Sequence, residues 1–339
     1  MAKLSERRTL ITGGAGFLGY HLALELSREP TNQLVLLDNL VRGRRDRDLQ
    51  SLITMSNVSF MEADLTEAAT FRGLGSDYDE VYHLAGIIGV HNVLDRPHEV
   101  LRVNAISTLL LLDWFAQGGG KKLMFASTSE AYAWTQKIIP LAVPTPEDVP
   151  LVLTELRNPR SSYAGSKIFG ELVVNQFCAT YNKPFVILRY HNVYGPRMGD
   201  DHVIPQLYAR ARQGQDPLIV YSANHTRAFC YVTDAVKATI RAMRETPANA
   251  QTINIGNDLE EITIGELAQI LLQKAKIRVS LEPRIATNDP IQRRCPDLAR
   301  ARQMLGYRPQ VALNEGLELT LAWYARNSTH TMLEPATPQ

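Results

Sequence analysis

Short apolar runs alternate with longer amphipathic stretches through the first part of the chain. The runs are rich in β-branched and aliphatic residues, which predicts buried strands, and the stretches between them place apolar residues at helical spacing. Such an alternation is typical of βαβ units around a parallel sheet. The predicted strands are Thr9–Thr12, Gln33–Asp38, Val58–Glu62, Glu80–Ala85, Lys122–Ser127 and Phe185–Arg189.

Three amphipathic stretches are long enough to form helices between these strands. The first is Phe17–Arg28, which Pro30 stops because proline cannot continue a helix. The others are His98–Gln117 and Ser161–Tyr181. We therefore expect an α/β domain with a doubly wound parallel sheet over residues 1–190.

The pattern changes near Gly195, where the elements become shorter and mixed. We expect a smaller mixed α/β domain over residues 191–327. Residues 228–250 are expected to return to the large domain, because Arg227–Arg244 has the pattern of a strand, a turn and a helix. The other predicted elements are the helices Val203–Gln213 and Thr263–Gln273 and the strands Leu218–Tyr221 and Thr252–Ile255.

Two segments are rich in loop-forming residues. Four prolines in Trp134–Pro150 predict a long loop, and residues 328–339 are expected to be a flexible tail.

The composition is that of an ordinary globular protein. Hydrophobic residues make up 45% of the chain and charged residues 21%, and the formal net charge is +1. A nearly neutral chain is not attracted in bulk to nucleic acid or to an acidic membrane surface, so neither is expected as a partner. The apolar runs are too short to span a membrane, and the first residues lack the apolar core of a signal peptide. We expect a cytoplasmic protein.

The cysteines agree with a reducing compartment. Cys178, Cys230 and Cys295 lie far apart, with no pair at metal-ligand or redox spacing. No metal site is predicted, and all three thiols are expected to serve packing.

Three glycines stand between the first predicted strand and the first predicted helix. Gly13, Gly16 and Gly19 would let the backbone approach a pyrophosphate, and the helix N-terminus would offer it free N–H groups. Asp38 ends the second strand, 19 positions after Gly19, where a carboxylate would accept hydrogen bonds from an adenosine ribose. The arrangement predicts a Rossmann-type dinucleotide site.

Asp38 also favours NAD over NADP, because a carboxylate repels a 2′-phosphate. A group of arginines follows it and could hold a phosphate instead, but its acidic neighbours Asp46 and Asp48 favour a solvated loop. The arginines are Arg42, Arg44, Arg45 and Arg47.

Tyr163 and Lys167 lie four positions apart on a predicted helix and so share one of its faces. A free tyrosine, with a pKa of about 10, is a poor base at neutral pH. A nearby ammonium in a partly dry site lowers that pKa, helped by the charge of an oxidised nicotinamide. The pair therefore predicts a tyrosine base that removes the proton of a hydroxyl group.

Together these motifs resemble the extended short-chain dehydrogenase/reductase superfamily, the NAD-dependent nucleotide-sugar epimerases, dehydratases and decarboxylases. The resemblance extends from Thr9 to about Tyr324. It implies that Asp64 and Leu65 contact adenine, and that Asn104 belongs to the helix beside the active site. The positions expected at NAD are Gly13, Gly16, Phe17, Leu18, Gly19, Asp38, Asn39, Asp64, Leu65, Leu84, Ala85, Gly86, Asn104, Ser127, Tyr163 and Lys167.

The resemblance also implies a nucleotide-sugar substrate and a homodimer. Asn192 and Arg227 match family positions at the substrate diphosphate, which a guanidinium binds well. Ser127 or Thr128 would hydrogen-bond the sugar hydroxyl that is oxidised, and the choice between them stays open. The helices His98–Gln117 and Ser161–Tyr181 resemble those that pair across a two-fold axis.

The reaction depends on the residues after the fifth strand. The family's 4,6-dehydratases have an aspartate where this chain has Ser129, and Ser127–Glu130 is similar to the same stretch of UDP-glucuronate decarboxylases. Arg294, aligned through Pro296, takes the place of their active-site arginine. The predicted catalytic residues are Tyr163, Lys167, Thr128, Ser129, Glu130 and Arg294.

Decarboxylation of a UDP-glucuronate-like substrate is thus favoured, and 4,6-dehydration and C4 epimerisation remain alternatives. A non-catalytic, dinucleotide-binding regulatory protein is an alternative of another class. Such a protein would be expected to lack Tyr163, Lys167 or the Ser127 and Thr128 hydroxyls, and all of them are present.

Overall fold

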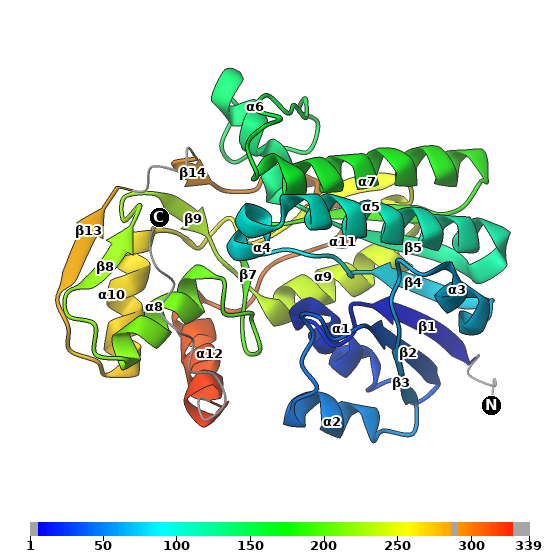
Figure 1. Cartoon of the computed structure of the whole chain (residues 1–339), viewed down its shortest axis with the longest axis horizontal. Helices are drawn as coiled ribbons and strands as arrows, with labels where there is room; N and C mark the ends of the chain where they lie inside the picture. Colours follow the sequence, from blue (N-terminus) through cyan, green and yellow to red (C-terminus); the bar gives the residue numbers. More distant parts are fainter. Residues whose placement is uncertain (1–5, 286–290, 328–339) are drawn as a thin grey trace.

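Seven parallel strands form the central sheet of the molecule (Figure 1). A computed structural model describes residues 6–285 and 291–327. The strands stand in the order β11-β6-β5-β4-β1-β2-β3. Their bounds are β1 Arg7–Thr12, β2 Asn32–Asp38, β3 Val58–Glu62, β4 Tyr78–His83, β5 Gly120–Thr128, β6 Phe185–Tyr190 and β11 Gln251–Ile255.

The strand order reverses between β1 and β4. The chain starts at β1, adds β2 and β3 on one side, and then crosses to β4, β5, β6 and β11 on the other. Loops that leave the carboxyl ends of β1 and β4 diverge, which opens a crevice at that edge of the sheet.

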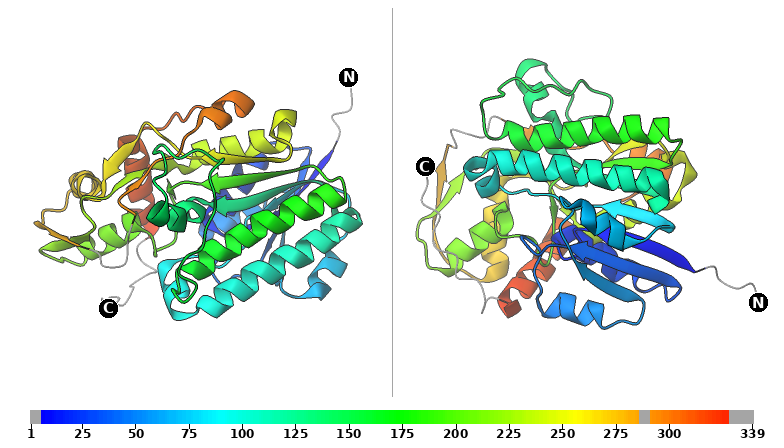
Figure 2. Two further views of the ribbon diagram at one scale, coloured as in Figure 1. Left: turned by 90° about the horizontal axis from the view of Figure 1, so that it is seen from above. Right: turned by 45° about the vertical axis from the view of Figure 1, so that its right-hand side comes forward.

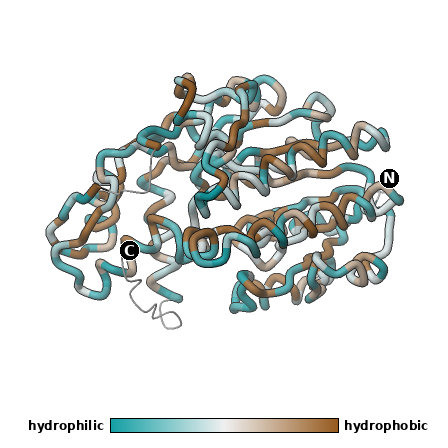
Figure 3. The backbone as a smooth tube through the Cα atoms, turned by 45° about the horizontal axis from the view of Figure 1, so that its top comes forward, coloured by the Kyte–Doolittle hydropathy of each residue, from teal (hydrophilic) through white to brown (hydrophobic). Residues whose placement is uncertain are grey.

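Alternate residues of the strands face two different helical layers. Ile11 and Leu36 belong to the core between the sheet, α1 (Phe17–Leu26) and α9 (Val232–Arg244). Leu10 and Val81 belong to the core on the opposite face, beneath α5 (Pro97–Trp114) and α7 (Ser161–Thr180). Helices α5 and α7 lie side by side as an outer layer (Figures 1 and 2). The hydrophobic stretches of the chain run through the middle of the molecule (Figure 3).

Shorter elements build the smaller part of the molecule, which lies beside the carboxyl edge of the sheet (Figure 1). β8 pairs with β13, β7 with β10, and β9 lies between β12 and β14. The bounds are β7 Val193–Tyr194, α8 Val203–Arg212, β8 Leu218–Tyr221, β9 Thr226–Ala228, β10 Cys230–Tyr231, β12 Glu261–Thr263, α10 Ile264–Ala275, β13 Leu281–Arg284, β14 Arg293–Arg294, α11 Ala299–Leu305 and α12 Leu313–Asn327. The remaining helices are α2 Arg47–Ile53, α3 Ala68–Leu74, α4 Val90–Asp95 and α6 Ala133–Ile138.

The predicted doubly wound sheet is confirmed, with three local differences. The fourth strand ends at His83 and not at Ala85, because the chain turns there beside the loop that contains Gly13. The helix expected over His98–Gln117 ends at Trp114, and a wider turn follows in which Gly118 has a φ of +99°. The predicted loop Trp134–Pro150 begins as the helix α6, since its first proline is Pro140.

The chain re-enters the large sheet late. Strand β11 forms the edge beyond β6, and α9 packs on α1. The tail expected at residues 328–339 lies outside the described residues. Within those described residues, no helix combines the length and the hydropathy that crossing a membrane requires.

Candidate active site

A cleft of about 970 Å³ lies where the strand order reverses. Its walls come from loops after β1, β2, β4, β5 and β7 and from the start of α7, and Arg294 of β14 also lines it. Segments far apart in the sequence therefore meet at the carboxyl edge of the sheet, where α/β proteins of this topology bind ligands.

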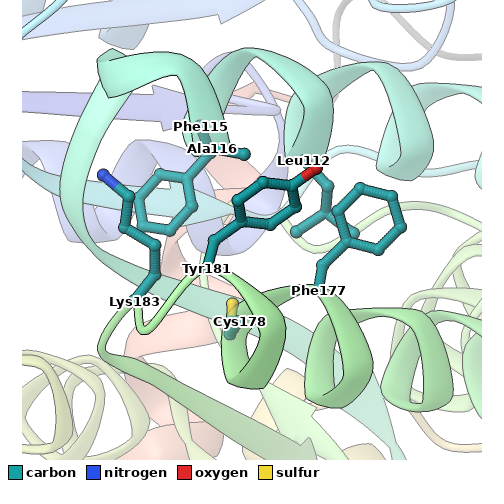
Figure 4. Close-up of a pocket in the computed structure, with 7 residues that line it drawn as sticks. All are labelled: Leu112, Phe115, Ala116, Phe177, Cys178, Tyr181 and Lys183. Carbon is teal, nitrogen blue, oxygen red and sulfur yellow. The ribbon is translucent and has the colours of Figure 1, made fainter.

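A second, shallower hollow lies near the opposite edge of the sheet, at the C-terminal ends of α5 and α7 (Figure 4). It is lined by apolar side chains with Lys183, which lies 5.5 Å from the centre of the Phe115 ring. Cys178 is buried there, and burial raises the pKa of its thiol to about 12. A neutral thiol among apolar groups serves packing, as predicted for the cysteines.

The glycine loop leaves no room for side chains. Gly13 has a φ of +73°, and a Cβ atom there would lie 2.8 Å from the main-chain nitrogen of Ala85. A Cβ atom on Gly19 would lie 2.0 Å from the carbonyl oxygen of Gly13. The loop can therefore fold tightly against the N-terminus of α1, whose first N–H groups and positive dipole favour an anion.

Asp38 and Asp64 stand at the ends of neighbouring strands and line the cleft. Asp38 accepts hydrogen bonds from the main-chain N–H groups of Ala15 (3.0 Å) and Leu40 (2.8 Å). Burial raises the pKa of Asp38, and these hydrogen bonds partly offset the shift. Asp64 accepts a 3.2 Å hydrogen bond from the side-chain amide of Asn39. The two acids and Asn39 thus form one polar wall of the cleft, and their contact with an adenosine stays a prediction.

The arginine-rich loop after β2 is held by acids from elsewhere in the chain. Arg44 pairs with Asp200, and Arg45 lies 3.7 Å from Glu62. Asp46 accepts a 2.8 Å hydrogen bond from Arg197. A solvated loop was expected, with the arginines interleaved with Asp46 and Asp48. Arg44 and Arg45 instead pair with acids outside the loop, Asp200 after β7 and Glu62 of β3.

Asn104 does not line the cleft. It lies buried on α5, accepts a 2.7 Å hydrogen bond from the main-chain N–H of Ile87, and donates one of 3.0 Å to Ser166 of α7. It holds the loop after β4, and so Leu84, Ala85 and Gly86, against the helix that carries Tyr163.

Tyr163 and Lys167 lie together on α7 and line the cleft. Burial raises the pKa of Tyr163 to about 12, opposed by a hydrogen bond with the Thr128 side chain. Lys167 donates a 2.9 Å hydrogen bond to the carbonyl oxygen of Ala126, and burial lowers its pKa to about 8. Thr128 is thus the hydroxyl residue that the structure places at the tyrosine.

The hydroxyl of Ser127 does not meet Tyr163 but a different side chain of α7. It donates a 2.5 Å hydrogen bond to Glu171, which lies one helical turn beyond Lys167. Glu171 also receives Arg189 through two hydrogen bonds of 2.8 and 2.6 Å. All three side chains are buried, so this network fixes β5, β6 and α7 to one another.

Glu130 and Arg294 form an ion pair at the cleft. Glu130 belongs to the 3-10 turn Ser129–Tyr132, and its main-chain N–H donates a hydrogen bond to the capping side chain of Thr128. The negative charge of Glu130 raises the pKa of Tyr163, which places the pair within electrostatic reach of the tyrosine. Ser129 is buried and also lines the cleft.

The two residues expected at the diphosphate differ in position. Asn192 lines the cleft and donates a 3.2 Å hydrogen bond to the carbonyl oxygen of Ala228. Arg227 is buried on β9 beside Arg294 of β14 and does not line the cleft. It donates a 2.8 Å hydrogen bond to the carbonyl oxygen of Thr226. Its predicted role stays a prediction.

Sequence reasoning missed several cleft residues, among them Arg96, Asp200 and Asp201. They lie in loops without a motif, so no signal in the sequence pointed to them. Glu171 was also missed, although its position four residues after Lys167 places both on one face of α7.

Comparisons with known proteins agree with this geometry. A model described as "NAD dependent epimerase/dehydratase family" matches residues 9–256. The chain is 34% identical over 328 residues to UDP-N-acetyl-alpha-D-glucosaminuronate decarboxylase of Bacillus cytotoxicus, covering 94% of this chain and 98% of that protein. It is 33% identical over 320 residues to UDP-glucuronic acid decarboxylase 5 of Arabidopsis thaliana, covering 93% and 88%.

The structure is also similar to UDP-glucuronic acid 4-epimerase from Bacillus cereus, solved with UDP-glucuronic acid and NAD. The TM-score is 0.82 at 25% identity, covering 94% of this chain and 99% of that chain.

Proposed function

The chain belongs to the NAD-dependent epimerase/dehydratase family, and we propose that it decarboxylates a UDP-linked hexuronic acid through a 4-keto intermediate. The observation that carries the proposal is the ion pair of Glu130 and Arg294, which lies at the cleft within electrostatic reach of Tyr163. A guanidinium at this place suits a substrate carboxylate. The decarboxylases from Bacillus cytotoxicus and Arabidopsis thaliana support the same reaction.

NAD, predicted from the glycine loop and Asp38, is confirmed as the cofactor by the family. The glycine loop would hold its pyrophosphate and Asp38 its adenosine ribose. A Cβ atom at Gly13 or Gly19 would clash with the main chain, so only glycine allows the tight turn that brings the helix N-terminus to a pyrophosphate. When bound, NAD supplies the acceptor for the hydride that leaves C4 of the sugar.

Tyr163 is the base of the first step. It takes the proton of the C4 hydroxyl as C4 is oxidised to a ketone, and Thr128 orients that hydroxyl and the phenol. Lys167 stabilises the phenolate by its charge. Because burial leaves the pKa of Tyr163 at about 12, ionisation needs the charge of the bound nicotinamide as well.

Arg294 acts in the second step. The C4 ketone lies β to the C6 carboxylate, so the C5–C6 bond can break, CO₂ can leave, and the electron pair of that bond enters the C4 ketone as an enolate. A proton added at C5 completes the decarboxylation. The hydride taken up by NAD would then return to C4, so that substrate and product differ by CO₂ alone. Arg294 orients the carboxylate, and Glu130 lines the same end of the cleft.

A panel of UDP-, dTDP-, GDP- and CDP-sugars, followed by mass spectrometry, tests the reaction. Loss of CO₂ from a UDP-uronic acid is the expected result. Tyr163→Phe should abolish NADH formation, and Arg294→Ala should still form NADH but accumulate it on the enzyme. Loss of water would instead identify a dehydratase, and an isomer of unchanged mass an epimerase.

C4 epimerisation is the second candidate. The similar 4-epimerase from Bacillus cereus was solved with UDP-glucuronic acid, a uronic acid that an arginine at the cleft would also suit. Dehydration is less favoured, because Ser129 stands where the dehydratases have an acid.

We also propose that the enzyme works as a homodimer in the cytoplasm. Leu101 of α5 and Leu172 of α7 are exposed on the outer layer, where a second copy would cover them. The three cysteines are free, which supports a reducing compartment.

A further inference from the structure

Asn254, near the end of β11, is completely buried and uses every polar atom of its side chain. Its Oδ1 atom accepts a 2.8 Å hydrogen bond from the hydroxyl of Tyr132 and lies 3.0 Å from Nε2 of His191. Its Nδ2 atom donates to the carbonyl oxygens of Thr145 (3.0 Å) and Asp297 (3.2 Å). One amide thus joins four segments that are distant in the sequence.

Two of these segments carry the residues of the proposed second step. Tyr132 closes the 3-10 turn that contains Glu130, and Asp297 lies three residues after Arg294. The loop around Thr145 completes the connection. The N–H of Thr145 donates a 2.8 Å hydrogen bond to the carbonyl oxygen of Cys295, and Thr145 accepts one of 2.9 Å from the N–H of Asp297. The segment after Arg294 is therefore tied to this loop, and both are tied to Asn254.

The same amide is connected to the rigid part of the molecule. The Tyr132 hydroxyl accepts a 2.8 Å hydrogen bond from Arg189, which the buried carboxylate of Glu171 holds. The main-chain N–H of Asn254 donates a 2.8 Å hydrogen bond to the side chain of Glu147, two residues after Thr145. Asn254 thus ties the turn that contains Glu130 and the segment after Arg294 to the central sheet.

We propose that Asn254 is a positioning residue that holds Arg294 against Glu130, and that it controls the step after oxidation and not oxidation itself. The inference rests on the proposed function. Tyr163, Lys167 and Thr128 lie on α7 and at the end of β5, and the hydrogen bonds of the Asn254 side chain go to other residues. Loss of its amide should release the Arg294 segment and leave the tyrosine in place.

Asn254→Asp is the sharpest change. The shape and the acceptor for Tyr132 remain, but an oxygen replaces the amide nitrogen that donates to Thr145 and Asp297. The carbonyl oxygen of Asp297 loses this donor, and that of Thr145 keeps only the main-chain N–H of Asp297. Asn57→Asp is the matched control. Asn57 is also buried, and its amide donates to the carbonyl oxygens of Ser27 (3.1 Å) and Asn32 (3.1 Å), before β3 at the opposite edge of the sheet. Both variants therefore remove buried amide donors.

Single-turnover kinetics of the NAD-loaded protein with UDP-glucuronic acid test the proposal. In Asn254→Asp, NADH formation should stay within about threefold of the intact protein, while CO₂ release slows by at least about tenfold and enzyme-bound NADH accumulates. In Asn57→Asp, the ratio of the rate of CO₂ release to the rate of NADH formation should stay that of the intact protein. Asn254→Ser, which removes the amide without adding a charge, should repeat the imbalance if Asn254→Asp does not fold.

Equal slowing of both steps, or an unchanged balance, overturns the inference. If the intact protein forms NADH but releases no CO₂, the proposed decarboxylation is wrong instead. In that case a crystal structure of the Asn254 variant decides the inference. Separation of Arg294 from Glu130 supports a positioning role, and an intact ion pair excludes it.

Discussion

Asp38, at the end of β2, accepts a hydrogen bond of 3.0 Å from the main-chain N–H of Ala15, in the glycine loop after β1. The carboxylate is therefore fixed beside the glycine loop that is proposed to hold the cofactor pyrophosphate, and it lines the same cleft. A carboxylate held there would accept hydrogen bonds from the hydroxyl groups of an adenosine ribose, and its charge would repel a 2′-phosphate.

NAD should consequently bind at least about tenfold more tightly than NADP, which corresponds to about 1.4 kcal/mol. Asp38→Ala should narrow this difference, because it removes both the acceptor and the repulsion. Titration calorimetry with both dinucleotides measures the two affinities. Comparable affinities in the intact protein would contradict the role given to Asp38.

The adjacent hydroxyl residues Ser127 and Thr128 should behave differently. Thr128 hydrogen-bonds Tyr163, so Thr128→Ala should slow NADH formation by about ten- to a hundredfold, and Thr128→Ser should restore most of it. Ser127 donates to the buried carboxylate of Glu171, so Ser127→Ala should lower the free energy of unfolding by about 1–2 kcal/mol. Single-turnover absorbance and urea unfolding separate the two effects. The assignment fails if Ser127→Ala slows oxidation more than Thr128→Ala does.

Helices α5 and α7 should form the contact between two copies of the chain. Leu172 is 57% exposed and Leu101 45% exposed on this layer. Leu172→Glu should convert a dimer into a monomer at micromolar concentration, because a charge would be buried in the interface. Leu259→Glu is the control, since Leu259 is 76% exposed but lies between β11 and β12. Sedimentation velocity gives the mass, and a monomeric intact protein would refute the expectation.

Stability should fall as the pH drops below about 6.5, the ordinary pKa of histidine. Burial lowers the pKa of His21 to about 4 and those of His83 and His191 to about 3. The unfolded chain therefore binds these protons first as the pH falls. The stability that the neutral side chains contribute is complete above pH 6.5 and is lost progressively, down to about pH 4 for His21 and about pH 3 for His83 and His191.

Each of these histidines should contribute a slope of up to about 1.4 kcal/mol per pH unit. Urea unfolding across this range measures the slope. His83→Gln should reduce it by about one proton, whereas His98→Gln, at an exposed position of α5, serves as the control. An unchanged slope in His83→Gln would show that this side chain does not titrate between the two states.

Motifs that depend on neighbouring residues were predictable from the sequence. Gly13, Asp38 and the pair Tyr163 and Lys167 lie in short patterns whose spacing follows from one strand, one turn or one helix. The family prediction rested on these patterns, and the family model and the similar decarboxylases confirm it. Which of Ser127 and Thr128 meets the tyrosine could not be predicted, because both hydroxyls reach side chains of α7. How that helix packs against the end of β5 decides that Ser127 meets Glu171 and Thr128 meets Tyr163.

Contacts between distant segments were not predictable either. Nothing near Asn254 in the sequence indicates that its amide meets Thr145 and Asp297. Arg44 was expected among its own acidic neighbours, but it pairs with Asp200 in a loop after β7. These partners are brought together by the strand order and by the return of the chain to the sheet at β11, which local patterns do not encode.

The ion pair of Glu130 and Arg294 also bears on how this architecture can change its chemistry. In the proposed mechanism, removal of a hydride needs Tyr163 and Thr128, which are supported by the sheet and α7. The fate of the ketone depends instead on a short turn and a short strand that are joined through Asn254. The residues for oxidation and those for the later step thus belong to separate parts of the molecule. Exchange of the Arg294 segment and its supporting loop could redirect a common keto intermediate to a new product, with no substitution among the groups that create it.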